Sequence, residues 1–310
     1  MGGFGAGSGR RVVLVTNGAS GALAERGLDP ARPAAALAAA GLDVVAEPAP
    51  TLPLPERLRA AAALPGIDAL VVAGGDGTLA CAAESLAGSG IPLGILPAGT
   101  MNLLARDLGL PLDLDAAARV VASGHPRAID LGEVNGRIFA INSVLGMPAR
   151  MQRHREARRG RFGLGALLGM AALLWRHLGR YPRMSATLDL AGTTRRIRFR
   201  TLAVVVGDYR EDVGAVLLRS GVDRGRFTLY VIAALSAQGL LRLGLGFAVG
   251  RWRQLPDLDR TETTQATLAV PRRRVRVMND GEVILLKPPL TYRIRPAALR
   301  VLVPREDDAP

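Results

Sequence analysis

The sequence predicts an α/β protein of two domains, a parallel-sheet domain followed by a mostly antiparallel β domain. The chain has 310 residues, and at about 100–200 residues per domain this length favours two domains. Residues 1–125 alternate short β-branched runs with Ala- and Leu-rich stretches, which is typical of parallel strands joined by crossover helices. From Ile129 onward, several segments alternate polar and apolar residues, as antiparallel strands with one wet face do. We therefore place the domains at 1–125 and 126–310, and leave open that the final strand returns to the first domain.

The first domain is expected to alternate strands and helices. Asp29 is suited to cap a helix with Pro30 at its first position, and the Ala-rich run that follows stops at Gly41. A second helix should end near Ala87, and a third should run through Arg106. The expected strands are 12–16, 44–45, 67–73 and 93–96. The third of these is apolar without alternation, which predicts burial on both faces.

The second domain is expected to be built of short strands. These are 138–144, 184–190, 195–206, 227–232, 264–270, 275–278, 283–286, 291–294 and 300–303. A basic, helical stretch from Arg150 to Arg180 interrupts them, with five arginines between Arg153 and Arg161. Two interpretations stay open for this stretch: a helix at a membrane surface, or a helix packed on the sheet with its arginines in water.

The charge of the chain favours anionic partners. It carries 40 basic and 27 acidic residues, a formal net charge of +13, and such an excess attracts nucleotide phosphates, anionic membranes or nucleic acid. We expect no nucleic acid partner, because the arginines are dispersed and only 4% of residues are aromatic. The only lysine, Lys287, precedes two prolines and fits neither a Walker P-loop nor a protein kinase.

The sequence carries no recognisable export or membrane-spanning segment. Met1 to Arg11 lacks the apolar region of a secretory signal. The longest apolar run, Phe162 to Trp175, is shorter than the roughly 18 residues of a spanning helix. A single cysteine, Cys81, excludes a disulfide within the chain. We expect a cytoplasmic protein, and the sequence leaves a homodimer open.

The sharpest local signal is the GGDGT loop, which comprises Gly74, Gly75, Asp76, Gly77 and Thr78. It follows a buried strand and opens a helix, so its amides and the positive helix N-terminus can hold phosphate without a lysine. The carboxylate of Asp76 would repel bare phosphate, which indicates a bound cation or a hydroxyl that needs orienting, and so favours phosphoryl transfer. The alternative is a tight turn with a local side-chain hydrogen bond.

Two further loops of small residues follow neighbouring strands. In the PAGTMN loop, 97–102, Gly99 allows close approach, while Thr100 and Asn102 can bond phosphate or adenine; alternatively, Thr100 caps the next helix. The NGASG loop after the first strand comprises Asn17, Gly18, Ala19, Ser20 and Gly21. Since the carboxyl ends of parallel strands share one edge of a sheet, the three loops together predict a nucleotide cradle.

These segments resemble the diacylglycerol kinase catalytic-domain family, the soluble lipid kinases that include bacterial diacylglycerol kinases and sphingosine and ceramide kinases. The matching segments are Asn17–Gly21, Gly74–Thr78, Pro92–Arg106 and Asp280–Glu282. Their order and spacing match over nearly the whole chain. GGDGT alone is also found in NAD kinases.

The resemblance implies a fold, a cofactor and a set of roles. It implies that the second domain is β-sandwich-like, with the active site between the domains. It implies that the three loops hold ATP, with Mg²⁺, and that Glu282 acts as general base with Asp280 orienting it or holding a magnesium-bound water. A carboxylate can take the proton of an alcohol as the phosphoryl group arrives. From the residues alone, Asn279-Asp280-Gly281 indicates a hairpin turn.

Several positions depart from the family pattern. Gly18 replaces the usual proline, and Ala80 and Cys81 replace a frequent Asn-Glu pair. Arg224 stands where members often carry an acid that helps to bind magnesium, and a guanidinium cannot bind a cation. Asp223 is then the candidate metal ligand; otherwise backbone carbonyls suffice or the site is absent.

The sequence therefore predicts an ATP-dependent lipid kinase that acts on a diacylglycerol-like or related lipid at an anionic membrane surface, to which it binds peripherally. Two alternatives remain open. The shared GGDGT loop allows a kinase of a soluble acceptor such as NAD. Arg224 and the missing Asn-Glu pair allow a non-catalytic module that binds nucleotide or membrane.

Overall fold

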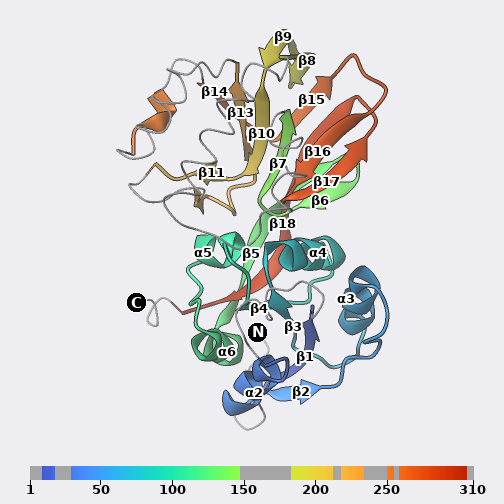
Figure 1. The fold of residues 1–310 in the computed structure, drawn as a ribbon. Helices are drawn as coiled ribbons and strands as arrows, with labels where there is room; N and C mark the ends of the chain where they lie inside the picture. The colour runs from blue at the N-terminus through green and yellow to red at the C-terminus, as the bar shows by residue number, and fades with distance from the viewer. Residues whose placement is uncertain are drawn as a thin grey trace. The chain divides into compact units, whose positions relative to one another are not determined.

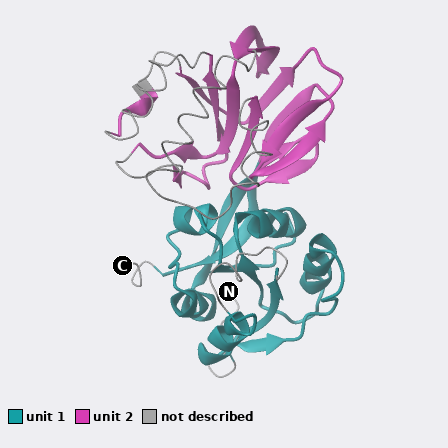
Figure 2. Ribbon diagram, viewed as in Figure 1, with its two compact units in different colours: residues 1–131, 295–310 teal, residues 132–294 magenta. Residues whose placement is uncertain are grey.

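The computed structural model describes residues 9–17, 29–146, 183–211, 218–233, 250–254 and 258–305. The chain divides into two compact units (Figure 2). Unit 1 comprises Met1–Leu131 and Arg295–Pro310, and unit 2 comprises Gly132–Ile294. Two strands, β5 (His125–Val134) and β18 (Leu290–Val303), run from one unit into the other. The arginine-rich stretch from Arg150 to Arg180 lies outside the described residues.

Unit 1 contains a parallel sheet (Figure 1). Its strands are β1 (Arg11–Thr16), β2 (Asp43–Val45), β3 (Ala69–Gly74), β4 (Leu93–Pro97) and the last part of β18, in the order β2-β1-β3-β4-β18. All the pairings are parallel. Every residue of β3 is buried, as its unbroken apolar run predicts for a strand covered on both faces.

Helices cover this sheet. α2 (Arg32–Ala39) and α6 (Leu114–Ser123) share a core with the side chains of Val71 and Leu96. α3 (Leu54–Ala62) and α4 (Asp76–Leu86) pack against each other and against β1 and β3. α2 begins two residues later than Asp29 and Pro30 predict, because the Asp29 carboxylate accepts the N–H of Ala31 at 2.9 Å in a turn that precedes the helix.

Unit 2 contains antiparallel sheets whose buried side chains form one core. The first sheet has the order β14-β13-β10-β7-β16-β17, and the second continues from β18 through β15 and β8 to β9. β5 pairs with β18, and β6 pairs with β5. The strands are β6 (Arg137–Phe139), β7 (Asn142–Gly146), β8 (Met184–Leu190), β9 (Thr193–Phe199), β10 (Thr201–Val206), β13 (Phe227–Ile232), β14 (Leu258–Thr263), β15 (Gln265–Ala269), β16 (Val275–Asn279) and β17 (Glu282–Leu286). A short pair, β11 (Asp208–Tyr209) and β12 (Arg219–Ser220), lies apart. The predicted fold class is confirmed.

Four expected strands of the second half were wrong in their extent. The segment 195–206 is two strands, β9 and β10, in different sheets, and 138–144 is likewise β6 and β7. At the second break, the N–H groups of Ala140 and Ile141 bond to the carboxylate of Asp280 instead of a neighbouring strand. Conversely, 291–294 and 300–303 belong to one strand, β18. No helix among the described residues is long and apolar enough to cross a membrane.

Gly132 leaves room for a buried aromatic ring, which gives a test of the packing in unit 2. Gly132 pairs with Phe139 across β5 and β6, and a Cβ on Gly132 would lie 2.1 Å from that ring. Gly132→Ala should therefore lower the free energy of unfolding by about 1–3 kcal/mol, the usual cost of overpacking. Urea unfolding measures it. Replacing Phe139 by leucine in the Gly132→Ala background should recover part of the loss; simple additivity of the two costs would contradict this account.

Candidate functional site

The GGDGT loop connects β3 to α4 at the carboxyl edge of the parallel sheet. Gly75 caps α4, which begins at Asp76. A Cβ on Gly74 would lie 2.6 Å from the side chain of Thr78, so this position accepts only glycine. The first turn of a helix leaves backbone N–H groups without helical partners. The loop therefore presents backbone donors at a positive helix end, as a phosphate site requires.

The PAGTMN loop lies directly against the GGDGT loop. A Cβ on Gly99 would lie 2.5 Å from the Cα of Gly75, and one on Gly75 would lie 3.1 Å from the Cα of Gly99. The N–H of Ala98 also donates to the carbonyl of Gly74 at 3.0 Å. The two loops thus meet backbone to backbone, with no space for side chains between them.

Asp76 ties the two loops together. Its carboxylate accepts the N–H of Leu103 at 2.7 Å, at the first residue of α5 (Leu103–Asp107). Burial raises the pKa of the Asp76 carboxyl, and hydrogen bonds from the backbone of Leu103, Asn102 and Leu104 oppose the rise. Here the carboxylate stabilises the N-terminus of a neighbouring helix, a role that neither sequence interpretation of Asp76 included.

Asn102 and Thr100 have different environments. Asn102 is 1% exposed and adopts a left-handed conformation with φ of 48°. Its amide accepts the N–H of Gly99 at 2.9 Å and donates to the carbonyl of Gly99 at 2.8 Å. The side chain is therefore engaged in shaping the loop. Thr100 is exposed and does not cap α5, because Asn102 occupies the cap position.

The first strand brings Asn17 to the same edge. Its side-chain amide donates to the hydroxyl of Thr78 at 3.2 Å, and Thr78 is 4% exposed. The rest of the NGASG loop, from Gly18 to Gly21, lies outside the described residues. Asn17 and the loops after β3 and β4 therefore come together in unit 1, as their positions after parallel strands predict.

The acids near the end of the chain lie on a tight turn in unit 2. Asp280 and Gly281 connect β16 to β17 with φ of 46° and 90°, the positive values of a two-residue hairpin turn. The turn interpretation is thereby confirmed. Glu282 is the first residue of β17 and pairs with Asn279.

The carboxylate of Asp280 is fully engaged by the backbone between β6 and β7. It accepts the N–H groups of Ala140 at 2.6 Å, Ile141 at 2.8 Å and Asn142 at 2.9 Å. The N–H of Asp280 donates in turn to the carbonyl of Asn142 at 2.9 Å. Burial raises the pKa of the Asp280 carboxyl, and the three N–H donors and the charge of Arg219 oppose the rise. Asp280 thus anchors the turn.

Unlike Asp280, Glu282 has a carboxylate that is open to a ligand. Its side chain is exposed, and it takes part in no hydrogen bond or ion pair with a described residue. A carboxylate without partners, two residues after an anchored aspartate, is suited to accept a proton from a bound hydroxyl.

Sequence reasoning missed two side chains next to this turn. The amide of Asn142 donates to the hydroxyl of Tyr209 at 3.0 Å, and Arg219, 2% exposed, donates to the backbone around Ala140. Asn142 lies inside an expected strand, and Arg219 is one arginine among many, so the sequence holds no local signal for either.

The described residues contain no cluster of three acids, histidines or cysteines that could hold a metal ion. Asp223 is exposed, and the side chain of its neighbour Arg224 lies against Gly221. Asp223 therefore does not belong to a cluster of three such side chains among these residues.

Comparison with known proteins agrees with this arrangement. Residues 11–134 match the diacylglycerol kinase catalytic domain, and residues 143–303 match the YegS C-terminal NAD kinase beta sandwich-like domain. A diacylglycerol kinase of Mycobacterium tuberculosis is 34% identical over 80% of this chain and 81% of its own. A protein of Pseudomonas fluorescens named as a probable YegS-like lipid kinase is 32% identical over 81% and 82% of the two chains.

A solved structure shows the same fold. The crystal structure of a diacylglycerol kinase from Bacillus anthracis superposes with a TM-score of 0.67 over 95% of this chain and 97% of that one, at 18% identity. The sequence matches and the paired domains together establish that the chain belongs to the diacylglycerol kinase catalytic-domain family of lipid kinases.

Proposed function

We propose that the protein transfers the γ-phosphoryl group of MgATP to the hydroxyl of a diacylglycerol-like lipid. The observation that carries this proposal is the backbone contact between Gly75 and Gly99. This contact leaves a cradle, a surface of backbone amides with no side chains between the two loops, and the chain belongs to a family of lipid kinases. Such a cradle suits the phosphates of a nucleotide. The magnesium enters with the nucleotide as part of the substrate.

The residues of the chain would divide the work of transfer. The GGDGT and PAGTMN loops hold the phosphates, with the exposed hydroxyl of Thr100 as a further donor. Glu282 takes the proton of the lipid hydroxyl. At the same time the hydroxyl oxygen bonds to the γ-phosphorus, and the bond from that phosphorus to the oxygen of the departing ADP breaks. Asp280 holds the turn that carries Glu282.

The direct test is a labelled MgATP assay on vesicles containing diacylglycerol, phosphatidylglycerol, a sphingoid base or ceramide. We expect a phosphorylated lipid, and Glu282→Gln should lower kcat by roughly 10²–10⁴-fold with ATP affinity unchanged, as loss of a general base does. Glu56→Gln, the same change at an exposed glutamate of α3, is the matched control and should not affect turnover.

The outcomes separate the alternatives. Activity on NAD without activity on any lipid would identify a kinase of a soluble acceptor, and nucleotide binding without turnover would identify a non-catalytic module. Normal turnover of the Glu282→Gln variant would move the base to Asp76 or Asp280.

The close approach of the loops predicts how nucleotide binding fails. Gly99→Ala must push the loops apart, so the Kd for MgATP should rise by about tenfold or more. Gly94→Ala is the control for stability: its Cβ would lie 3.0 Å from the side chains of Val71 and Val121, within the sheet core. Calorimetric titration should show weak binding for Gly99→Ala alone; equal affinity of both variants would exclude the cradle.

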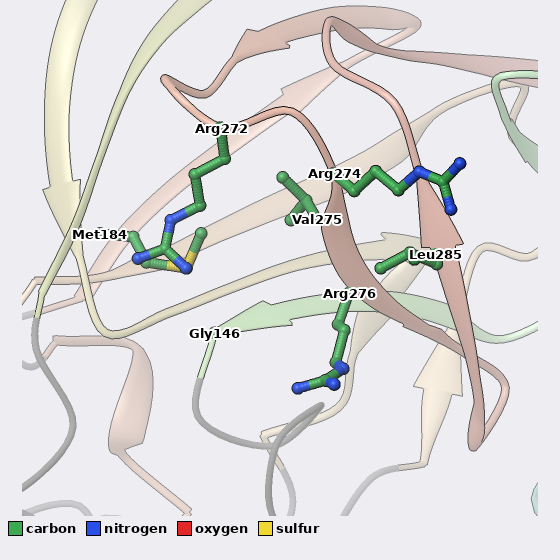
Figure 3. Close-up of a pocket in the computed structure, with 7 residues that line it drawn as sticks. All are labelled: Gly146, Met184, Arg272, Arg274, Val275, Arg276 and Leu285. Atoms are coloured by element: carbon green, nitrogen blue, oxygen red, sulfur yellow. The ribbon is translucent and has the colours of Figure 1, made fainter.

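We further propose that unit 2 offers a face for anionic lipid headgroups. A pocket of about 230 Å³ is lined by Gly146, Met184, Arg272, Arg274, Val275, Arg276 and Leu285. The three arginines are exposed, and none forms an ion pair with a described carboxylate. Figure 3 shows their side chains leaving the strand and its preceding turn in different directions. Leu285 is 52% exposed beside them. Splayed cations around an exposed apolar side chain suit a surface of many headgroups.

This face predicts salt-sensitive vesicle binding. Replacing Arg272, Arg274 and Arg276 together by glutamine should weaken sedimentation with phosphatidylglycerol-containing vesicles by about tenfold or more at low salt. The matched control replaces three exposed arginines of unit 1, Arg59, Arg119 and Arg300. If both triple variants bind alike, only net charge matters and this face is not specific.

A further inference from the structure

A buried arginine bonds to carbonyl groups of the backbone segment whose N–H groups bind Asp280. Arg219, on β12, is 2% exposed. One of its terminal nitrogens, Nη1, donates to the carbonyls of Ala140 at 2.9 Å, Val206 at 3.0 Å and Ile141 at 3.3 Å. Three carbonyl oxygens thus surround one cationic nitrogen.

Asp280 and Arg219 bond to different groups of the same short backbone segment. Asp280 accepts the N–H groups of Ala140, Ile141 and Asn142, while Arg219 donates to the carbonyls of the first two. The chain at this point passes from β6 in one sheet to β7 in the other. Two charged side chains therefore supply partners to this backbone, beside the N–H of Val206, which donates to the carbonyl of Ile141 at 3.1 Å.

We propose that Arg219 is a positioning residue for the turn that carries Glu282. It is an internal cation that fixes the carbonyl groups of Ala140 and Ile141, so that the N–H groups of residues 140–142 hold Asp280. This inference rests on the proposed function, in which Glu282 is the base. Burying an arginine without such partners would be costly, and the three carbonyls together with the nearby carboxylate supply them.

The charge of Arg219 also bears on the ionisation of Asp280. The Arg219 guanidinium opposes the rise that burial causes in the pKa of the Asp280 carboxyl. Removing the cation should raise that pKa further. A protonated Asp280 loses acceptor capacity for the three N–H groups, so the acid limb of the activity profile should move to higher pH.

The test compares Arg219→Met, Arg219→Lys and Arg219→Ala with the parent in the lipid kinase assay. We expect Arg219→Met to lower kcat by about 10–10²-fold, as misplacement of a reacting group does, with the KM for MgATP within about twofold of the parent. Its acid limb should lie at higher pH. Arg219→Lys, which keeps the charge, should recover part of kcat. Millimolar guanidinium should restore activity to Arg219→Ala. The control variant Arg224→Ala, which alters an exposed arginine of the same segment, should keep the parent kcat with or without guanidinium.

Other outcomes would overturn the proposal. A folded Arg219→Met variant with the parent kcat and pH profile would show that Arg219 does not position the base. If guanidinium restored only thermal stability to Arg219→Ala, the role would be structural alone.

A second measurement is independent of activity. In a double-mutant cycle of Arg219→Met and Asp280→Asn, followed by urea unfolding, the two costs should not add, because both side chains hold the same backbone. Additivity would refute the coupling. If the parent phosphorylates no lipid and the cycle still shows coupling, the proposed function fails while the link between Arg219 and Asp280 stands.

Discussion

The second unit depends on how the backbone groups of residues 140–142 are satisfied. A chain that leaves one sheet for another must give up its ladder hydrogen bonds, and buried peptide groups without partners are costly. Asp280 and Arg219 supply the replacements, one for the N–H side and one for the carbonyl side. The same contacts join the β16–β17 hairpin to the β6–β7 crossing. The position of Glu282 is therefore set by the packing of the two sheets and not by the hairpin alone.

The first unit depends on a different constraint: two of its loops can meet only where no side chains stand between them. Gly75 and Gly99 let two loops meet at their backbones, and the amide of Asn102 and the carboxylate of Asp76 hold those loops in shape. Polar side chains that a sequence reader would assign to a ligand are thus used to build the surface on which the ligand would sit. Because the N–H groups of Gly99 and Leu103 are bonded to Asn102 and Asp76, the donors of the proposed phosphate site belong to the GGDGT loop at the start of α4.

The sequence predicted much of the fold because strands and turns carry local signals. The strands 184–190 and 227–232 have the predicted bounds, and the turn at Asp280 follows from its Asn-Asp-Gly chemistry. The break at Ala140 was missed because apolar residues continue through it, and the break at Arg200 because an alternating run leads directly into an apolar one. In both places only the change of partner strand ends the strand. The partners of Asp280 lie far away in sequence, and no periodicity marks them. Candidate residues were found by type; their division into anchors and free groups needed the coordinates.

The long strand β18 links the folding of the two units. Its final residues complete the parallel sheet of unit 1, where Val301 pairs with Leu93, and its first residues pair with β15 in unit 2. Partners separated by roughly 200 residues raise the contact order and slow folding. During synthesis, the edge of β4 that pairs with β18 stays unpaired until the ribosome has made nearly all of the chain. A nascent nucleotide domain of this protein would expose a sheet edge through most of its translation, which is the period in which chaperones would matter most for it.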